Sequence, residues 1–160
     1  MGTKTEALAA KFEQACKDFE SKIRGLSDAD WQAKTPEEGW TVAATAHHAA
    51  GSTGPISMIA NSAATGSPMP PITADGLNQM NADHAKQYAN VSREDTLALL
   101  SETTEPAADL VRGFSDEQLT GKAKLPLNGM ELTAEQIIEN VLIGHITTHA
   151  ASISAAAAVA

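Results

Sequence analysis

Residues 141–160 read VLIGHITTHAASISAAAAVA, and this stretch decides the fold because it lacks formal charge and approaches membrane-spanning length. A helix of this kind either crosses a membrane or lies in the core of a helical protein. Alanine supplies most of its apolar character, and histidines and hydroxyl side chains interrupt it. The segment is therefore too weakly apolar to offset the insertion of two imidazoles into lipid. We expect a buried core helix and no membrane partner.

Three further long helices are predicted from apolar periodicity and from cap residues. The first spans residues 3–24 and ends at Gly25, the second begins at Thr41, and the third spans 93–112 after a cap at Ser92. Thr133, with Gln136 three residues later, forms the capping box that begins the last helix. The chain therefore alternates long helices with connectors.

Glycine and proline predict irregularities within this layout. Gly51, Gly54 and Pro55 interrupt the second helix, and Pro106 lies inside the third, where it would kink or restart the helix. The segments expected from these signals are a kink or break near Gly51, a loop over 65–73 and a further helical piece over 74–90.

The two longest connectors begin with a similar motif. Residues 25–28, GLSD, follow the first helix, and residues 113–116, GFSD, follow the third. In each case an irregular segment, 26–39 or 115–132, leads to a helix that carries histidine. This repeated arrangement of helix, connector and helix indicates an all-α four-helix bundle with at least one crossover connection. At its length the chain is expected to form one domain over 1–160.

Composition and charge narrow the possible functions. Hydrophobic residues make up 42% of the chain and aromatic residues only 4%, so alanine carries much of the apolar content, which favours helices over sheets. Asp and Glu number 20 against 11 Lys and Arg, and the formal charge of −9 repels nucleic-acid phosphates. We therefore expect no nucleic-acid partner.

The single cysteine and the first residues bear on the cellular compartment. Cys16 has no partner for an internal disulfide, which fits a reducing cytoplasm, and we expect it to be a buried small hydrophobe. The opening residues, MGTKTEALAAKFEQ, are charged throughout and lack the apolar core of a signal peptide. Both features predict a cytoplasmic location.

His145 and His149 stand four residues apart on the last helix, so their rings project from one face a turn apart. Two buried imidazoles without partners would each cost roughly a few kcal/mol, whereas a shared metal ion satisfies both. An H-x-x-x-H pair alone also suits separately hydrogen-bonded core residues or surface neighbours. The apolar residues on the same face are Ile138, Val141, Leu142 and Ile153.

The other three histidines lie on two different segments. His47 and His48 are adjacent on the second helix, so their side chains diverge by about 100° and at most one of them can join the C-terminal pair. Alanines surround both, so the helical wheel does not decide between them. His84 lies among polar residues, and we expect it on the solvated surface.

Two motifs resemble those of the DinB/YfiT-like superfamily. Residues 39–48, GWTVAATAHH, are similar to the start of the second helix in that family, where a metal-ligand histidine stands eight residues after the tryptophan. In this chain that position is His48. Residues 144–153, GHITTHAASI, resemble the terminal helix whose H-x-x-x-H pair supplies the other two ligands, here His145 and His149. The middle of the chain also reads like the helix pair in the branch that contains mycothiol-dependent maleylpyruvate isomerases.

The resemblance implies a four-helix bundle, a three-histidine site for a divalent metal, and a homodimer. Three protein ligands leave a coordination position for water or substrate, which is typical of catalytic sites. Zinc is the simplest choice, and imidazole also accepts nickel, iron or copper. The metal would activate water for hydrolysis or hold a low-molecular-weight thiol as its thiolate. Characterised relatives favour a thiol-linked S-transferase or isomerase acting on a small-molecule substrate.

A second interpretation stays open, in which the protein is a non-catalytic dimeric bundle whose metal is structural or absent. The sequence offers no convincing general base beside the three histidines, because Glu139 lies off the face of His145 and His47 diverges from its neighbour. Trp31 and Trp40 are expected to anchor the core rather than to line a pocket mouth. The sequence therefore assigns no catalytic residue.

Overall fold

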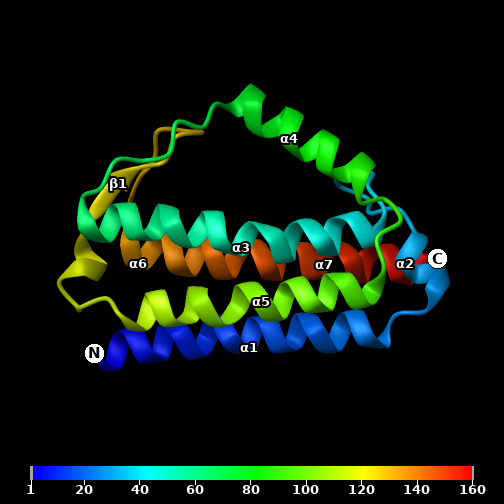
Figure 1. Cartoon of the computed structure of the whole chain (residues 1–160), viewed down its shortest axis with the longest axis horizontal. Helices are drawn as coiled ribbons and strands as arrows, with labels where there is room; N and C mark the ends of the chain where they lie inside the picture. The colour runs from blue at the N-terminus through cyan, green and yellow to red at the C-terminus, as the bar shows by residue number, and fades with distance from the viewer. Residues whose placement is uncertain (1, 160) are drawn as a thin grey trace.

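Long helices dominate the computed structural model, which describes residues 2–159 (Figure 1). The 3₁₀ turn, the π turn and the two strands are short. In chain order the elements are α1 (Thr3–Gly25), α2 (Asp28–Gln32), α3 (Val42–Thr65), α4 (Ala74–Gln87), α5 (Arg93–Arg112), the 3₁₀ turn η1 (Gln118–Thr120), β1 (Lys122–Lys124), β2 (Glu131–Thr133), α6 (Ala134–Ile137), the π turn η2 (Ile138–Ile143) and α7 (Gly144–Val159). The last three follow one another without a gap, and we refer to them together as the C-terminal helix.

Four of these helices form the bundle. Helix α5 packs against α1 and α3, and the C-terminal helix packs against the same two helices, so α1 and α3 lie diagonally opposite each other. Helix α1 and the C-terminal helix run in one direction, and α3 and α5 run in the other (Figure 1). Helix α4 carries the chain back along the outside of α3. This arrangement confirms the predicted all-α four-helix bundle with crossover connections.

The C-terminal helix lies in the core, as its sequence predicts. Over Ala134–Ala158 it is the one helix, within the described residues, that is long and apolar enough to cross a membrane by length and composition. Its large apolar side chains are instead buried against the other helices. The fully buried members are Ile137, Ile138, Leu142, Ile146 and Ile153.

Local capping explains where the helices begin. The Thr41 side chain accepts a hydrogen bond from the Ala44 amide, and the Ser92 side chain accepts one from Asp95. Thr133 and Gln136 form the predicted reciprocal capping box. Since each of these caps needs only a polar side chain three residues before its partner, the sequence predicts the helix starts to within one residue.

The repeated motif is also structural. The Ser27 side chain accepts from the Asp30 amide while the Ser27 amide donates to the Asp30 carboxylate. Ser115 makes the same pair of bonds with Gln118. In both connectors the serine therefore starts a short helical turn directly after a long bundle helix.

The predicted break near Gly51 is absent. Helix α3 is continuous from Val42 to Thr65 with Pro55 inside it, and α5 likewise continues through Pro106. Proline removes one backbone hydrogen bond and crowds the carbonyl four residues earlier. Both helices tolerate this loss because buried residues on either side of each proline hold them in the bundle.

The predicted irregular segment 115–132 contains a small hairpin. Strands β1 and β2 pair antiparallel, with Ala123 opposite Leu132, and β1 contacts α3. The turn between them includes Gly129, whose φ of 66° lies in the left-handed region that favours glycine. The Asn-Gly pair at 128–129 is the one sequence signal for this hairpin.

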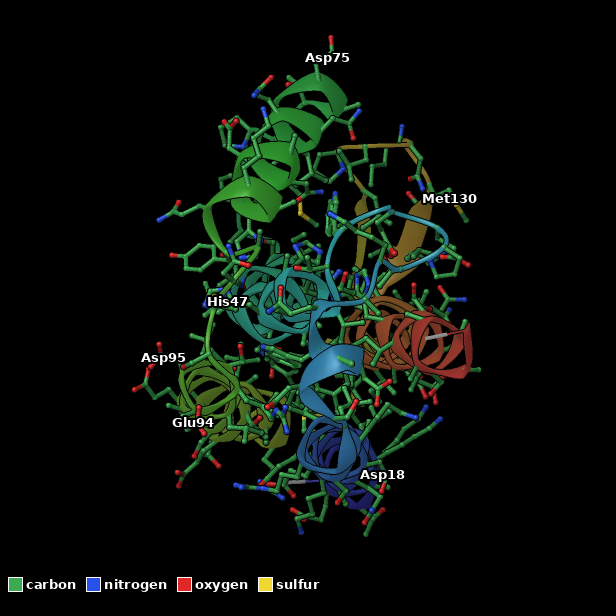
Figure 2. All side chains as sticks on the ribbon, turned by 90° about the vertical axis from the view of Figure 1, so that its right-hand side faces the viewer. Asp18, His47, Asp75, Glu94, Asp95 and Met130 are labelled. Carbon is green, nitrogen blue, oxygen red and sulfur yellow. The ribbon has the colours of Figure 1, made fainter. Side chains whose placement is uncertain are left out.

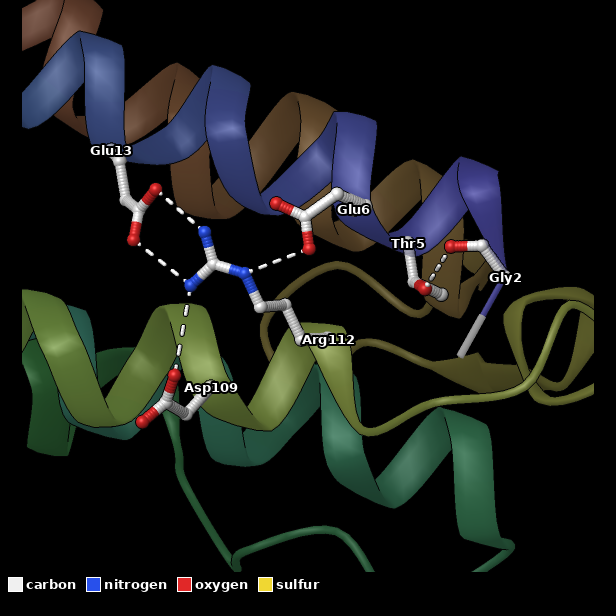
Figure 3. A network of polar contacts seen from close by, with 6 residues as sticks. All are labelled: Gly2, Thr5, Glu6, Glu13, Asp109 and Arg112. Carbon is white, nitrogen blue, oxygen red and sulfur yellow. Dashed lines mark hydrogen bonds and ion pairs between the residues drawn. The ribbon is translucent and has the colours of Figure 1, made fainter.

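Arg112 joins α1 to α5 (Figure 3). Its two terminal nitrogens donate to the Glu13 carboxylate oxygens at 2.9 and 2.7 Å, and its Nε donates to Glu6 at 3.0 Å. A bidentate guanidinium–carboxylate pair fixes geometry as well as charge. These contacts therefore set the lengthwise register of the two helices.

Candidate metal centre

Three histidines from two neighbouring helices meet in the bundle. His48 lies in the first half of α3, and His145 and His149 lie on α7, which packs against α3. One ring nitrogen from each residue lies within 4.8 Å of the other two. His47 is not a member of this group, in accordance with the divergence of adjacent helical side chains.

The separations between these nitrogens suit a metal ion better than hydrogen bonds. Nε2 of His145 lies 3.2 Å from Nε2 of both His48 and His149. A neutral ring nitrogen carries either one hydrogen or one lone pair, so it satisfies only one such neighbour. Three nitrogens bound tetrahedrally to zinc at about 2.0–2.1 Å stand about 3.3 Å apart. The donor set therefore fits a metal ion.

Burial keeps the three imidazoles neutral near pH 7. It lowers the pKa of His145 to about 3 and the pKa of His48 to about 4, and the neighbouring His149 adds to both shifts. Burial also lowers the pKa of His149, although Glu38 opposes this shift. Neutral imidazoles present the lone pairs that metal ions bind.

Glu38 approaches the site from the connector before α3. Its Oε1 lies 3.3 Å from Nδ1 of His149, and its Oε2 accepts a hydrogen bond from Ser152 at 3.0 Å. The contact with His149 is close but is not aligned as a hydrogen bond. Burial alone would raise the pKa of Glu38, but hydrogen bonds from Thr35 and Ser152 outweigh it and lower the pKa.

In metal sites, a carboxylate commonly orients a histidine ligand through the ring nitrogen that does not bind the metal. At 3.3 Å the negative charge of Glu38 favours the tautomer with its proton on Nδ1, which leaves the Nε2 lone pair facing the other two rings. Glu38 cannot be predicted as a site residue from local sequence, because it lies more than a hundred residues from His149. Its only local signal is an acidic pair, Glu37 and Glu38, just before the Gly-Trp motif at 39–40.

The two tryptophans have different surroundings. Trp31 is buried and its indole N–H donates to the Val91 carbonyl at 2.9 Å, so it anchors the core as predicted. Trp40 is only half-buried and lines a surface cavity, contrary to the expectation of a core anchor. Its ring meets the His48 ring edge-on, with centroids 5.4 Å apart. Trp40 therefore separates the histidine cluster from the cavity.

His84 does not lie on the solvated surface as predicted. It is half-buried, and its Nε2 lies 2.8 Å from Nδ1 of His47. Tyr88 stacks on His47 with ring centroids 3.9 Å apart. Figure 2 shows His47 on the side of α3 away from the C-terminal helix. The prediction was wrong because α4, although its sequence is polar, directs the rings of His84 and Tyr88 towards α3.

These rings form a second group beside the first. The His84 ring centroid lies 5.8 Å from that of His48, so all five histidines of the chain lie in one continuous cluster. Burial lowers the pKa of both His47 and His84, which keeps this outer pair neutral as well. Helix α4 is therefore attached to α3 next to the candidate metal ligands.

A widened turn directly precedes the two α7 ligands. In η2 the Gly144 amide donates to the Glu139 carbonyl five residues earlier, instead of four as in an α-helix. Glu139 itself lies on the outside, 3.6 Å from Lys11. Glu139 therefore lies away from the histidine cluster, as its helical spacing from His145 predicts.

Comparison with known proteins agrees with this architecture. The family model described as mycothiol maleylpyruvate isomerase N-terminal domain matches residues 12–137, which include His48 and end before His145 and His149. No curated protein matches the sequence.

Solved structures show the same fold at low sequence identity. Mycothiol-dependent maleylpyruvate isomerase superposes with a TM-score of 0.73 at 13% identity, covering 96% of this chain, which spans only 63% of that protein. YfiT from Bacillus subtilis, described as a probable metal-dependent hydrolase with an unusual four-helix bundle topology, gives a TM-score of 0.73 at 19% identity, covering 97% and 87%. The sibling lethal factor precursor DfsB gives 0.67 at 17% identity, covering 97% and 95%.

Proposed function

Since the chain belongs to the mycothiol maleylpyruvate isomerase N-terminal domain family, we propose that it is a metal-dependent enzyme whose ligands are His48, His145 and His149. The single observation that carries this proposal is the convergence of three neutral ring nitrogens at separations suited to one ion. Glu38 supports it, because a carboxylate beside Nδ1 of His149 orients a metal ligand.

Three protein ligands leave a position for water or substrate, so the site suits catalysis. A divalent metal bound there would lower the pKa of a bound water or hold a thiol as its thiolate. Zinc is our first choice, with nickel and iron as alternatives, because imidazole ligands accept all three. The protein's own contribution is to hold the three rings neutral by burial and to place the charge of Glu38 beside Nδ1 of His149.

The reaction we propose is a thiol-linked S-transfer or isomerisation of a small molecule, with metal-dependent hydrolysis as the alternative. The first choice follows from the family and from the structural similarity to mycothiol-dependent maleylpyruvate isomerase. The second follows from the similarity to YfiT. We further propose a single domain, a homodimer and a cytoplasmic location, supported by the resemblance and by the buried free thiol of Cys16.

The first test is metal analysis of the purified protein. We expect about one divalent ion per chain in the natural sequence and in His47→Ala, a matched control on the same helix that is not one of the three proposed ligands. The ion should be lost from His48→Ala and from the double variant His145→Ala, His149→Ala. Equal metal content in all four proteins would refute the proposed site.

The second test addresses catalysis. Metal-loaded protein is screened against electrophilic small molecules with and without low-molecular-weight thiols, and the double histidine variant serves as the inactive control. Thiol-dependent turnover supports transfer or isomerisation, and thiol-independent turnover supports hydrolysis. A four-ligand metal shell without water, measured by X-ray absorption, would instead favour the non-catalytic bundle with a structural metal.

A further inference from the structure

A cavity lies between the C-terminal half of α4 and the segment that leads into α3. Its volume is about 340 Å³. Ala82 and Ala85 of α4, together with Ala89 just after the helix, form one side, and Trp40 lies on the opposite side. Figure 1 shows α4 outside the bundle, with its C-terminal end approaching the start of α3. The cavity therefore opens at the one place where α4 meets the bundle.

Specific contacts hold both walls in place. The Thr41 hydroxyl donates to the Ala89 carbonyl at 2.8 Å and so ties the end of α4 to the start of α3. On the other wall, Lys34 pairs with Thr41 in an isolated β-bridge, and the Thr35 amide donates to the Trp40 carbonyl at 2.8 Å. The stacking of Tyr88 on His47 secures α4 further. The cavity is therefore a built feature of the fold.

Its charge is opposite to that of the chain. Lys34 and Lys86 line it and no acidic residue does, although the chain as a whole carries a charge of −9. Neither lysine forms an ion pair with any residue in the described part of the chain. The cavity between α1 and α5 differs, because four of its lining residues are acidic. Two unpaired ammonium groups at one cavity select an anion.

The remaining lining is mostly apolar, with Thr41 as its one polar side chain. Alanine methyl groups face the cavity from α4, and Trp40 supplies a large aromatic side chain. Within residues 2–159, the indole N–H of Trp40 donates no hydrogen bond, in contrast to that of Trp31. A planar apolar body fits between such walls, and stacking on tryptophan is a common way to hold one.

The cavity also adjoins the candidate metal centre. Trp40 lines the cavity, and its ring centroid lies 5.4 Å from that of His48. A molecule in the cavity is thus one side chain away from the histidine cluster.

We propose that this cavity binds a small organic oxyanion, with the anionic group on Lys34 and Lys86 and a planar apolar body against Trp40. That the bound molecule is the substrate of the metal site rests on the proposed function. The binding itself needs only the cavity.

The test is titration with benzoate, followed by the chemical shift of the Trp40 indole N–H, on the protein as purified. We expect saturable binding that becomes roughly tenfold weaker in the double variant Lys34→Gln, Lys86→Gln. The matched control is Lys17→Gln, Lys124→Gln, which changes the net charge equally at two exposed lysines outside the cavity. Benzyl alcohol, which keeps the ring without the charge, should bind more weakly than benzoate.

Two outcomes would overturn the proposal. One is equal weakening in both lysine variants, which would indicate a response to net charge alone. The other is loss of benzoate binding in His145→Ala, His149→Ala while the Lys34, Lys86 variant binds normally, which would place the anion on the metal. If the natural protein holds no metal but binds benzoate through Lys34 and Lys86, the proposed enzymatic function fails and the anion site stands.

Discussion

Glu38 Oε1 lies 3.3 Å from Nδ1 of His149, although 110 residues separate the two in the chain. His149 is neutral because burial lowers its pKa, so this contact orients a ring proton more than it pairs two charges. We predict that Glu38→Gln weakens metal binding by roughly 10- to 100-fold, as measured by competition with a chromophoric chelator.

The neighbouring residue provides the control for this prediction. Glu37 is exposed and forms no hydrogen bond or ion pair with the residues that the structure describes, and its charge acts on His149 less than that of Glu38, so Glu37→Gln should weaken metal binding much less than Glu38→Gln. Equal weakening in the two variants would mean that general negative charge, and not the position of Glu38, supports the metal.

Metal binding should stabilise the fold measurably. A ligand present at 100 times its dissociation constant raises the free energy of unfolding by about 2.7 kcal/mol. We therefore expect zinc in that excess to raise the melting temperature of the natural protein and of His47→Ala. In thermal scans, His145→Ala, His149→Ala should show no such rise, and a rise of the same size there would contradict the assigned ligands.

The stability of the metal-free protein should depend on pH. The pKa of His145 is about 3 and that of His48 about 4 in the folded protein, against an ordinary value of 6.5. At a pH between the folded-state pKa values and the ordinary value, the unfolded chain binds more protons than the folded one. The free energy of unfolding therefore falls as the pH falls below about 6.5. Each histidine contributes up to about 1.4 kcal/mol per pH unit.

Urea unfolding at several pH values, with chelator present, measures this slope. His145→Ala should show a shallower dependence than the natural protein. A stability that rises towards pH 4 would show that the imidazoles are not buried as neutral groups.

Gly121 is predicted to tolerate no side chain. A Cβ there would lie 2.3 Å from the carbonyl oxygen of Ala63, a backbone atom of α3 that cannot move alone. Gly121→Ala should therefore cost roughly 1–3 kcal/mol of stability by overpacking. At Gly25, at the end of α1, no atom lies within 4 Å of an added Cβ, so Gly25→Ala should be neutral or slightly stabilising. Chemical denaturation distinguishes the two.

Cys16 should be unreactive in the folded state. It is buried, and burial raises the pKa of its thiol to about 11. We expect Ellman's reagent to modify it slowly at pH 8 and rapidly once the protein is unfolded in guanidinium. Fast modification of the folded protein would mean that the α1–α5 interface opens readily.

Local sequence signals predicted most of the bundle. The caps at Thr41, Ser92 and Thr133 depend on residues only three positions away, so they can be read directly from the sequence. The inward face of the last helix follows from periodicity in the same way. His48, His145 and His149 meet as expected, and their role as metal ligands stays a prediction.

The missed features of the site depend on contacts between distant segments. Glu38 meets His149 only when the first connector folds over α7, and His84 becomes half-buried only because α4 lies on α3. Helical periodicity reports which residues of one element face inward, but not which part of another element they meet. The predicted break at Gly51 failed for the same reason, since packing on both sides keeps the helix intact.

The π turn over Ile138–Ile143 has a consequence for how the length of this protein can vary. A π turn contains one residue more than the regular α-helical turn that would connect the same two helices in the same orientation. Deleting one residue inside it should leave the inward faces of α6 and α7 aligned. The same deletion a few residues later, before His149, would rotate the rest of the helix by about 100°. Within the C-terminal helix, a change in length is therefore expected to be tolerated best in this turn.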